Sequence, residues 1–201
     1  MSETLLIAGT FVLALIATIA LIVVRRRLDR THQTRVETIE HRLAETHSVE
    51  RTHLERPPTL RELAVVDRTD DDRPVYVPIV RFDLGMTEAP SMDLVFEFVG
   101  STLETVHPIL VADPDVRIRH YDVQFTFGPS GLFVSRLCQR VSVPLELVDR
   151  LCRDAKYRKF DLQRDVRDGD AGDGETPPVM WGDCREYRRS DDSSDGAGNV
   201  R

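Results

Sequence analysis

The tripeptide His120, Tyr121 and Asp122 has the composition most typical of an enzyme site. It falls in the segment with the strongest β-strand pattern, and alternate side chains of a strand share a face, which places His120 and Asp122 about 6–7 Å apart. A carboxylate at that distance can orient an imidazole for general acid–base catalysis. Because no nucleophile can be assigned to the pair, we favour a structural hydrogen-bonded pair and predict no catalytic residue.

Four arginines lie near this tripeptide on the two strands of a predicted hairpin. In a chain with a net charge of −7, such a cluster offers guanidinium groups to a phosphate, an anionic lipid or an acidic partner helix. Cross-strand pairing with Glu97, Asp122 and other acids is the alternative that we favour. The candidate anion or partner contacts are Arg117, Arg119, Arg136 and Arg140.

The histidines and aspartates show no spacing typical of a metal site. None of the four histidines in residues 28–56 has another histidine four positions away, and Asp70 to Asp72 lack the glycine of a calcium-binding loop. The chain also has no glycine-rich phosphate loop, no metalloprotease motif and no nucleophile elbow. We therefore predict no metal and no cofactor, and a non-enzyme is favoured over an enzyme.

The three cysteines, Cys138, Cys152 and Cys184, are too few for a disulfide framework. Cysteines of this kind suit a reducing cytoplasm. Cys138 on a predicted strand and Cys152 on the following helix suggest a redox couple, but buried cysteines more often behave as small apolar side chains. We expect two core thiols and one loose thiol.

Residues 1–27 are predicted to form a transmembrane anchor. The apolar run at residues 5–24 is long enough to span a bilayer as a helix, and Arg25, Arg26 and Arg27 follow it directly. A cleaved signal peptide would have its positive charges before the run and a small-residue cleavage site after it. By the positive-inside bias, the N-terminus is outside and the rest of the chain is cytoplasmic.

Residues 28–56 contain no glycine or proline and are predicted to form a helical stalk. Val36, Ile39 and Leu43 have the spacing of a coiled-coil seam, but polar residues stand where the seam would continue. Self-association through the stalk is therefore an open alternative to a monomer. Pro57 and Pro58 end the helix.

Residues 57–162 are predicted to form one α+β domain. Thr59 and Glu62 have capping-box spacing for a short helix, and Pro78 marks the first strand as an edge strand. We expect an antiparallel sheet in the order ββαββα with helices on one face, a two-layer fold, and a bulge or twist near Arg119 and His120. The expected strands are residues 74–82, 94–99, 116–127 and 132–143, and the expected helices are residues 101–110 and 144–156.

Residues 163–201 are acidic and rich in glycine, and we predict that they are mostly disordered. They contain an isolated apolar island around Trp181. This island either docks on the domain or serves as a short partner-binding motif. We favour docking, because a tryptophan is seldom left in water.

The composition is unusual in its charged residues. All but two of the 27 basic residues, Lys156 and Lys159, are arginine, and aspartate outnumbers glutamate. Together with the anchor and residues 116–143 (VRIRHYDVQFTFGPSGLFVSRLCQRVSV), this composition resembles that of uncharacterised haloarchaeal single-span membrane proteins. The resemblance implies a halophilic membrane protein, but no activity and no site. A GC-rich genome would also explain the arginine excess.

Two functions follow from these features. The favoured one is a membrane-anchored cytoplasmic module for protein interaction or assembly, since the chain has an anchor, a spacer and a sheet but no reacting constellation. The alternative is a small ligand sensor or enzyme that uses the sheet face near His120, Asp122 and the arginines. A polar pocket would favour the alternative, and a flat face the interaction module. No nucleic acid is expected as a partner.

Overall fold

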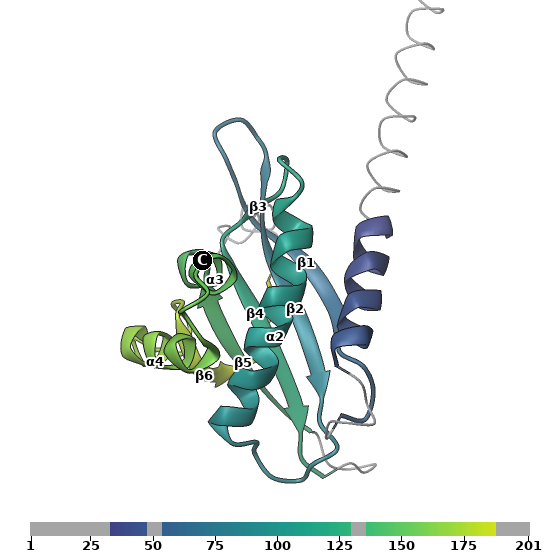
Figure 1. Ribbon diagram of the computed structural model, residues 1–201, viewed down its shortest axis with the longest axis vertical. Helices are drawn as coiled ribbons and strands as arrows, with labels where there is room; N and C mark the ends of the chain where they lie inside the picture. The colour runs from purple at the N-terminus through teal and green to yellow at the C-terminus, as the bar shows by residue number, and fades with distance from the viewer. Residues whose placement is uncertain (1–32, 48–53, 130–135, 188–201) are drawn as a thin grey trace, which may run out of the picture. The chain divides into compact units, whose positions relative to one another are not determined.

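A computed structural model describes residues 33–47, 54–129 and 136–187 of the chain (Figure 1). The predicted span at residues 5–24 lies outside the described residues. The chain divides into two compact units, Met1–Thr38 and Ile39–Arg201, and the second contains the sheet. Residues 33–46 are helical, which confirms this part of the predicted stalk. Ile39 and Leu43 are fully buried in the second unit, so the domain begins inside the stalk helix.

The domain is α+β, as the sequence predicts, and its sheet has six strands. The strand order is β1-β2-β4-β5-β6, and the short β3 pairs with β2. The elements are β1 Thr59–Arg68, β2 Pro74–Asp83, α2 Met92–Val111, β3 Arg117–Ile118, β4 His120–Phe127, β5 Leu137–Pro144, α3 Leu145–Arg153, α4 Lys159–Gly169 and β6 Val179–Asp183.

The sheet is mixed, which corrects the prediction of an antiparallel sheet. Strands β2 and β4 are parallel neighbours with Val80 opposite Val123, while β1, β5 and β6 run antiparallel to their neighbours. Two parallel neighbours need a long crossover, and the 20-residue helix α2 supplies it. The prediction failed here because it assigned only the second half of α2 to a helix.

The segment expected to be a strand at residues 94–99 lies in α2. Ser91 caps this helix by accepting a hydrogen bond from the backbone of Leu94, and Pro108 lies inside it. Phe96 and Phe98 are buried, and so are Val95 and Val99 at odd positions, whereas Glu97 is exposed, so buried apolar side chains occur at both parities. Periodicity cannot distinguish a buried strand from a buried helix in such a segment.

The predicted short helix at Thr59 is wrong, because Thr59–Arg68 is strand β1. Its ladder with β2 determines the conformation despite the capping-box spacing of Thr59 and Glu62. Strand β1 ends the sheet, so β2 is an interior strand even though it contains Pro78. The predicted bulge near Arg119 is confirmed: β3 stops at Ile118, and the Arg119 amide donates to the Tyr76 carbonyl.

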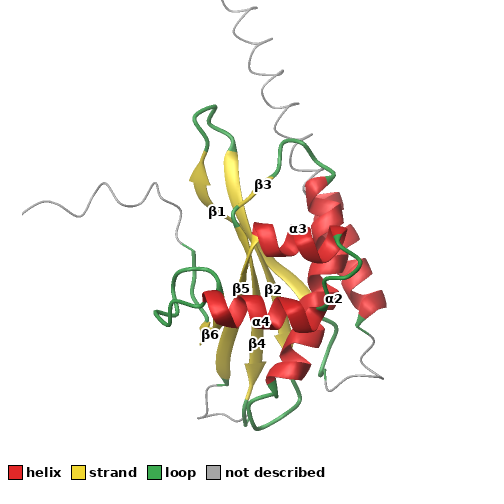
Figure 2. Cartoon of the chain, turned by 60° about the vertical axis from the view of Figure 1, so that its left-hand side comes forward, coloured by secondary structure: helices red, strands yellow, loops and turns green. Residues whose placement is uncertain are grey.

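Helices α2 and α3 lie on one face of the sheet (Figure 2), where the aromatic core forms. Phe98 of α2 packs 5.0 Å from Phe82 of β2, measured between ring centroids, and Phe125 of β4 stacks on Phe82 at 5.3 Å. Among the described residues, α2 is also the helix long and apolar enough to span a membrane. The apolar side chains of α2 are mostly buried in this core, so packing within the domain accounts for the apolar composition of the helix.

Part of the segment predicted to be disordered is folded. Helix α4 and strand β6 occupy Lys159–Gly169 and Val179–Asp183, and β6 pairs with β5. Trp181 docks in the way we favoured, with its ring 5.9 Å from Phe125 and 6.1 Å from Phe127. Pairing with β5 gives this polar segment a partner that its composition does not reveal.

Candidate functional site

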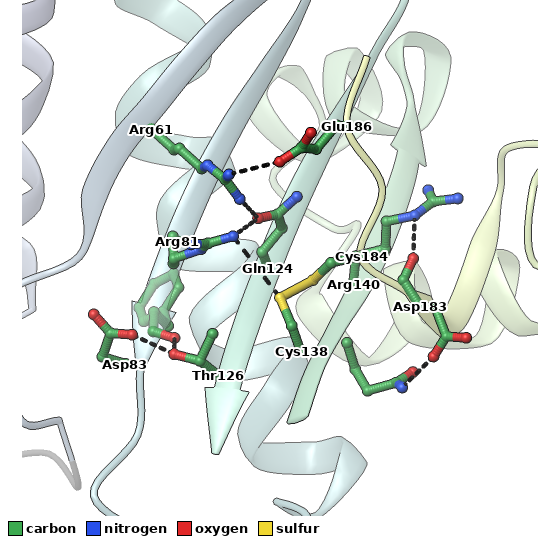
Figure 3. Close-up of a disulfide and its surroundings, with 12 residues drawn as sticks. Arg61, Arg81, Asp83, Gln124, Thr126, Cys138, Arg140, Asp183, Cys184 and Glu186 are labelled. Atoms are coloured by element: carbon green, nitrogen blue, oxygen red, sulfur yellow. Dashed lines mark hydrogen bonds and ion pairs between the residues drawn. A yellow bond between two sulfur atoms is a disulfide. The ribbon is translucent and has the colours of Figure 1, made fainter. Parts of the chain in front are cut away.

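A short segment crosses the sheet face that points away from α2. Residues 184–187, here named the strap, follow β6 and lie over β5, β4 and β1. Cys184 is joined to Cys138 of β5 by a disulfide, and Glu186 pairs with Arg61 of β1 at 3.5 Å (Figure 3). Tyr187 packs against a cluster of Ala64, Val77 and Ile79. The strap therefore covers the face that the sequence left open to water or a partner.

Beneath the strap lies a buried polar network centred on Asp122. Ser142 donates to Asp122 Oδ1 at 2.5 Å, and Tyr187 donates to Oδ2 at 2.8 Å. His120 Nε2 lies 2.8 Å from the Tyr187 hydroxyl and 3.5 Å from Asp122 Oδ1. Arg140 Nη1 is 3.4 Å from the same carboxylate and also donates to Ser142. All of these groups except Tyr187 are at least nine-tenths buried.

The network keeps Asp122 ionised. Burial by itself would raise the pKa of Asp122, but His120, the charge of Arg140 and the hydroxyl of Ser142 outweigh burial and hold this pKa below its ordinary value. The same carboxylate acts on Tyr187, whose pKa is raised by burial and then by the charge of Asp122. A negative Asp122 and a protonated Tyr187 are therefore the stable forms.

The polar groups of the network bond to one another and to the backbone. Both oxygens of Asp122 are occupied, and Arg140 uses its remaining nitrogens on the carbonyls of Gly174 at 2.7 Å and Asp183 at 3.0 Å. Gly174 has a φ of 67°, a backbone conformation that suits glycine and aims its carbonyl at the guanidinium. Arg140 thus ties β5, β6 and the loop before β6 to the buried carboxylate.

The structure separates the four candidate arginines. Arg140 is buried against Asp122, whereas Arg136 binds Glu55 at 2.9 Å and the Leu84 carbonyl. Arg117 donates to the Pro114 carbonyl at 2.9 Å, and Arg119 lines a pocket described below. Pairing with acids, the alternative that we favoured, is thus present for Arg136 and Arg140.

Glu97, one of the acids expected to pair with these arginines, binds Lys159 at 2.6 Å instead. The reason is that Glu97 belongs to helix α2 rather than to a strand beside the hairpin. Glu97 and the arginines of the hairpin therefore lie on different elements.

The cysteines depart from the expected pattern of three thiols. Cys138 and Cys184 form a disulfide with their Cα atoms 5.5 Å apart, so the expectation of free thiols at these two positions is wrong. Cys152 is free, and burial, followed by the charges of Glu104 and Asp149, raises its pKa to about 11. A thiol with this pKa is unreactive at neutral pH, in agreement with its expected role as an apolar side chain.

A polar pocket of about 360 Å³ opens between the end of β1, the start of β4 and the strap. Its wall contains two arginines, one acid and the edge of the Asp122 network. The lining residues are Val66, Arg119, His120, Glu175, Thr176, Pro177, Arg185 and Tyr187. Of these, the sequence singled out Arg119 and His120.

Apart from Val66 of β1, the remaining wall comes from the segment predicted to be disordered. Arg185 and Tyr187 lie immediately after Cys184, so the disulfide brings them to the pocket. Glu175 and Thr176 are held by a turn in which Asp173 accepts from both of their backbone amides at 2.8 Å. Only the isolated apolar island around Trp181 indicated from sequence that this segment docks.

The described residues contain no cluster of three or more His, Cys, Asp or Glu side chains suited to a metal ion. Comparison with known protein families, curated proteins and solved structures found no match. The protein is therefore described by its geometry, as an α+β domain in which the strap lies on one face of the sheet and a polar pocket lies beside the strap.

Proposed function

We propose that this chain is a membrane-anchored recognition module that binds a small ligand in the polar pocket and performs no chemistry on it. The observation that supports this is the pocket of about 360 Å³ beside His120, at the sheet face named by the alternative hypothesis. Its volume lies in the range of small-molecule sites. The neighbouring Asp122 network is committed to internal hydrogen bonds, which leaves this network without a free acid, base and nucleophile among the described residues.

The anchor is part of the same proposal. Residues 5–24 would hold the chain in the membrane, and the arginines at 25–27 would keep the domain in the cytoplasm. A disulfide is stable in oxidising compartments, and in a reducing cytoplasm it is usually transient or redox-sensing. The Cys138–Cys184 bond would therefore be reversible in the cell, and closure of the strap would follow the redox state.

A module that binds another protein is the second proposal, in line with the favoured hypothesis from sequence. Strand β1 ends the sheet and could accept a strand from a partner. Two register shifts within β1, however, make this edge irregular, and such bulges oppose strand addition. The strap further covers the sheet face that a partner would use. The pocket is therefore the better-supported recognition surface.

The experiment uses the full-length chain in detergent and a panel of anionic, cationic and neutral small molecules. Thermal unfolding is measured for the wild type, for Arg119→Trp, which fills the pocket entrance, and for Arg117→Trp, a matched exposed arginine outside the pocket. We expect at least one compound to raise the melting temperature of the wild type and of Arg117→Trp, but not of Arg119→Trp.

A second measurement separates the two proposals. Proteins are recovered from native membranes with the wild type and with Arg119→Trp. If no compound stabilises the wild type and both chains recover the same specific partner, the pocket proposal fails and the interaction module replaces it.

A further inference from the structure

Most arginines of the described residues are paired with acids, and the arginines of the polar pocket are among those that are not. In a chain with 34 acidic residues, most guanidinium groups of the described part lie within 4 Å of a carboxylate. The paired arginines are Arg42, Arg56, Arg61, Arg68, Arg73, Arg136, Arg140, Arg150, Arg153, Arg164 and Arg167.

Both arginines of the polar pocket lack such a pair. Arg119 is exposed, and its side chain has no hydrogen bond or ion pair with any described residue. The guanidinium of Arg185 lies 4.5 Å from the centre of the Tyr187 ring, and its Nη1 donates to the Glu175 carbonyl at 3.4 Å. Among the described residues, neither arginine is therefore paired with a carboxylate, and the pocket wall carries two cations and the single acid Glu175.

One nitrogen of Arg185 also lacks a partner in the described part of the chain. Arg185 Nε has no acceptor among the described residues, as is also true of Arg81 Nε, Arg136 Nε and Gln124 Nε2 outside the pocket, so this observation does not by itself indicate a ligand. Arg81, Arg117 and Arg158 also lack a carboxylate of any described residue within 4 Å, and none of the three lines this pocket. Arg81 donates to Gln124 at 2.8 Å, and Arg117 donates to the Pro114 carbonyl.

The other wall residues limit the charge and size of the ligand. Glu175 places one carboxylate in the wall, which repels a doubly charged anion more than a singly charged one. Val66, Pro177 and the Tyr187 ring supply apolar contacts for a small organic group. A guanidinium group matches a carboxylate through two parallel hydrogen bonds.

We propose that the pocket binds a small organic monocarboxylate, with its carboxylate held by Arg119 and Arg185 and its apolar part against Val66, Pro177 and Tyr187. This inference rests on the proposed function, because it names the ligand class of the same pocket. The strap supplies Arg185 and Tyr187, so the complete site forms only when Cys184 holds the strap in place.

Benzoate is a suitable probe, because benzamide has the same shape without the charge. Binding of benzoate, benzamide and inorganic phosphate to the full-length chain in detergent is measured by equilibrium dialysis at one fixed salt concentration, since salt screens charge. We expect benzoate to bind more tightly than benzamide and phosphate. Arg119→Gln should weaken benzoate binding by about tenfold or more, whereas the control Arg117→Gln should leave it within about twofold.

Equal binding of benzoate and benzamide, or equal benzoate binding by Arg119→Gln and the wild type, would overturn the inference. Tighter binding of phosphate would do the same by assigning a different anion. If benzoate fails but a cationic or neutral compound binds in a manner blocked by Arg119→Trp, the ligand class is wrong and the proposed function stands. If no compound of any class binds, both are wrong.

Discussion

The pKa of His47, at the end of the stalk helix, is changed by the groups that surround its ring. Its ring lies 5.1 Å from that of Phe82 and 5.7 Å from that of Phe98. Burial, followed by the positive charge of Lys159, lowers its pKa from 6.5 to about 4. His47 is therefore neutral in the folded protein, while in the unfolded chain it accepts a proton near pH 6.5.

This difference predicts a pH dependence of stability. Between pH 6.5 and about 4 the unfolded chain binds a proton that folded His47 does not, so the free energy of unfolding falls as the pH falls. The loss is roughly 3 kcal/mol across this range. His107, whose pKa burial also lowers, acts in the same direction.

His47→Leu should flatten this dependence when chemical unfolding is followed at several pH values from 4 to 7. The exposed His41, which lies 3.4 Å from Glu45, offers the control His41→Gln. A slope unchanged in His47→Leu, or flattened equally in His41→Gln, would contradict the assignment.

Asp122 supplies the second prediction at this scale. Asp122→Asn keeps the shape of the side chain but leaves the buried Arg140 without a compensating charge. Breaking a buried pair in this way costs about 3–5 kcal/mol. Urea unfolding should show a loss of this size for Asp122→Asn and a loss below about 0.5 kcal/mol for the exposed Asp115→Asn. Comparable losses in both variants would mean that the network does not depend on its central carboxylate.

At the scale of elements, the strap is the segment whose position depends most on one bond. The disulfide closes a loop with a sequence separation of 46 residues. Loop-closure entropy assigns such a cross-link about 4 kcal/mol. The noncovalent contacts of the strap include the ion pair of the exposed Glu186 with Arg61, the hydrogen bonds of Tyr187 with Asp122 and His120, and the apolar packing of Tyr187.

Cys184→Ser should therefore destabilise the domain by about 2–4 kcal/mol and expose the strap. Limited trypsin digestion provides the second readout, because cleavage after Arg185 should become faster in Cys184→Ser and in the reduced wild type. Cys152→Ser is the control, since Cys152 lies outside the disulfide. Protection of Arg185 that persists in Cys184→Ser would show that the strap stays in place without the bond.

At the scale of the whole molecule, the domain is expected to be attached to a membrane through residues 5–24. Deleting these residues should move the protein from the membrane pellet to the soluble fraction after alkaline carbonate extraction. Arg26→Ala leaves the apolar run intact, so it serves as the control and should remain in the pellet. Full-length protein in the soluble fraction would refute the anchor.

Local patterns predicted much of the fold. The alternation of Tyr121, Val123, Phe125 and Phe127 correctly indicated a strand with its apolar side chains on one face, although both faces of β4 are buried, and the change of parity near Arg119 indicated the bulge. The helix after Pro144 also begins where its spacing predicted. These features depend on neighbours along the chain, which a sequence reveals directly.

What the sequence determined by itself is the α+β class, the central strand and its bulge, and the apolar run at residues 5–24. The tertiary structure decided the parallel pairing of β2 with β4, the pairing of Cys138 with Cys184, and the meeting of Arg119 with Arg185 in one pocket. Each of these joins residues far apart in the chain. Such pairings depend on how α2 crosses the sheet and where β6 adds to it, and no local periodicity encodes either.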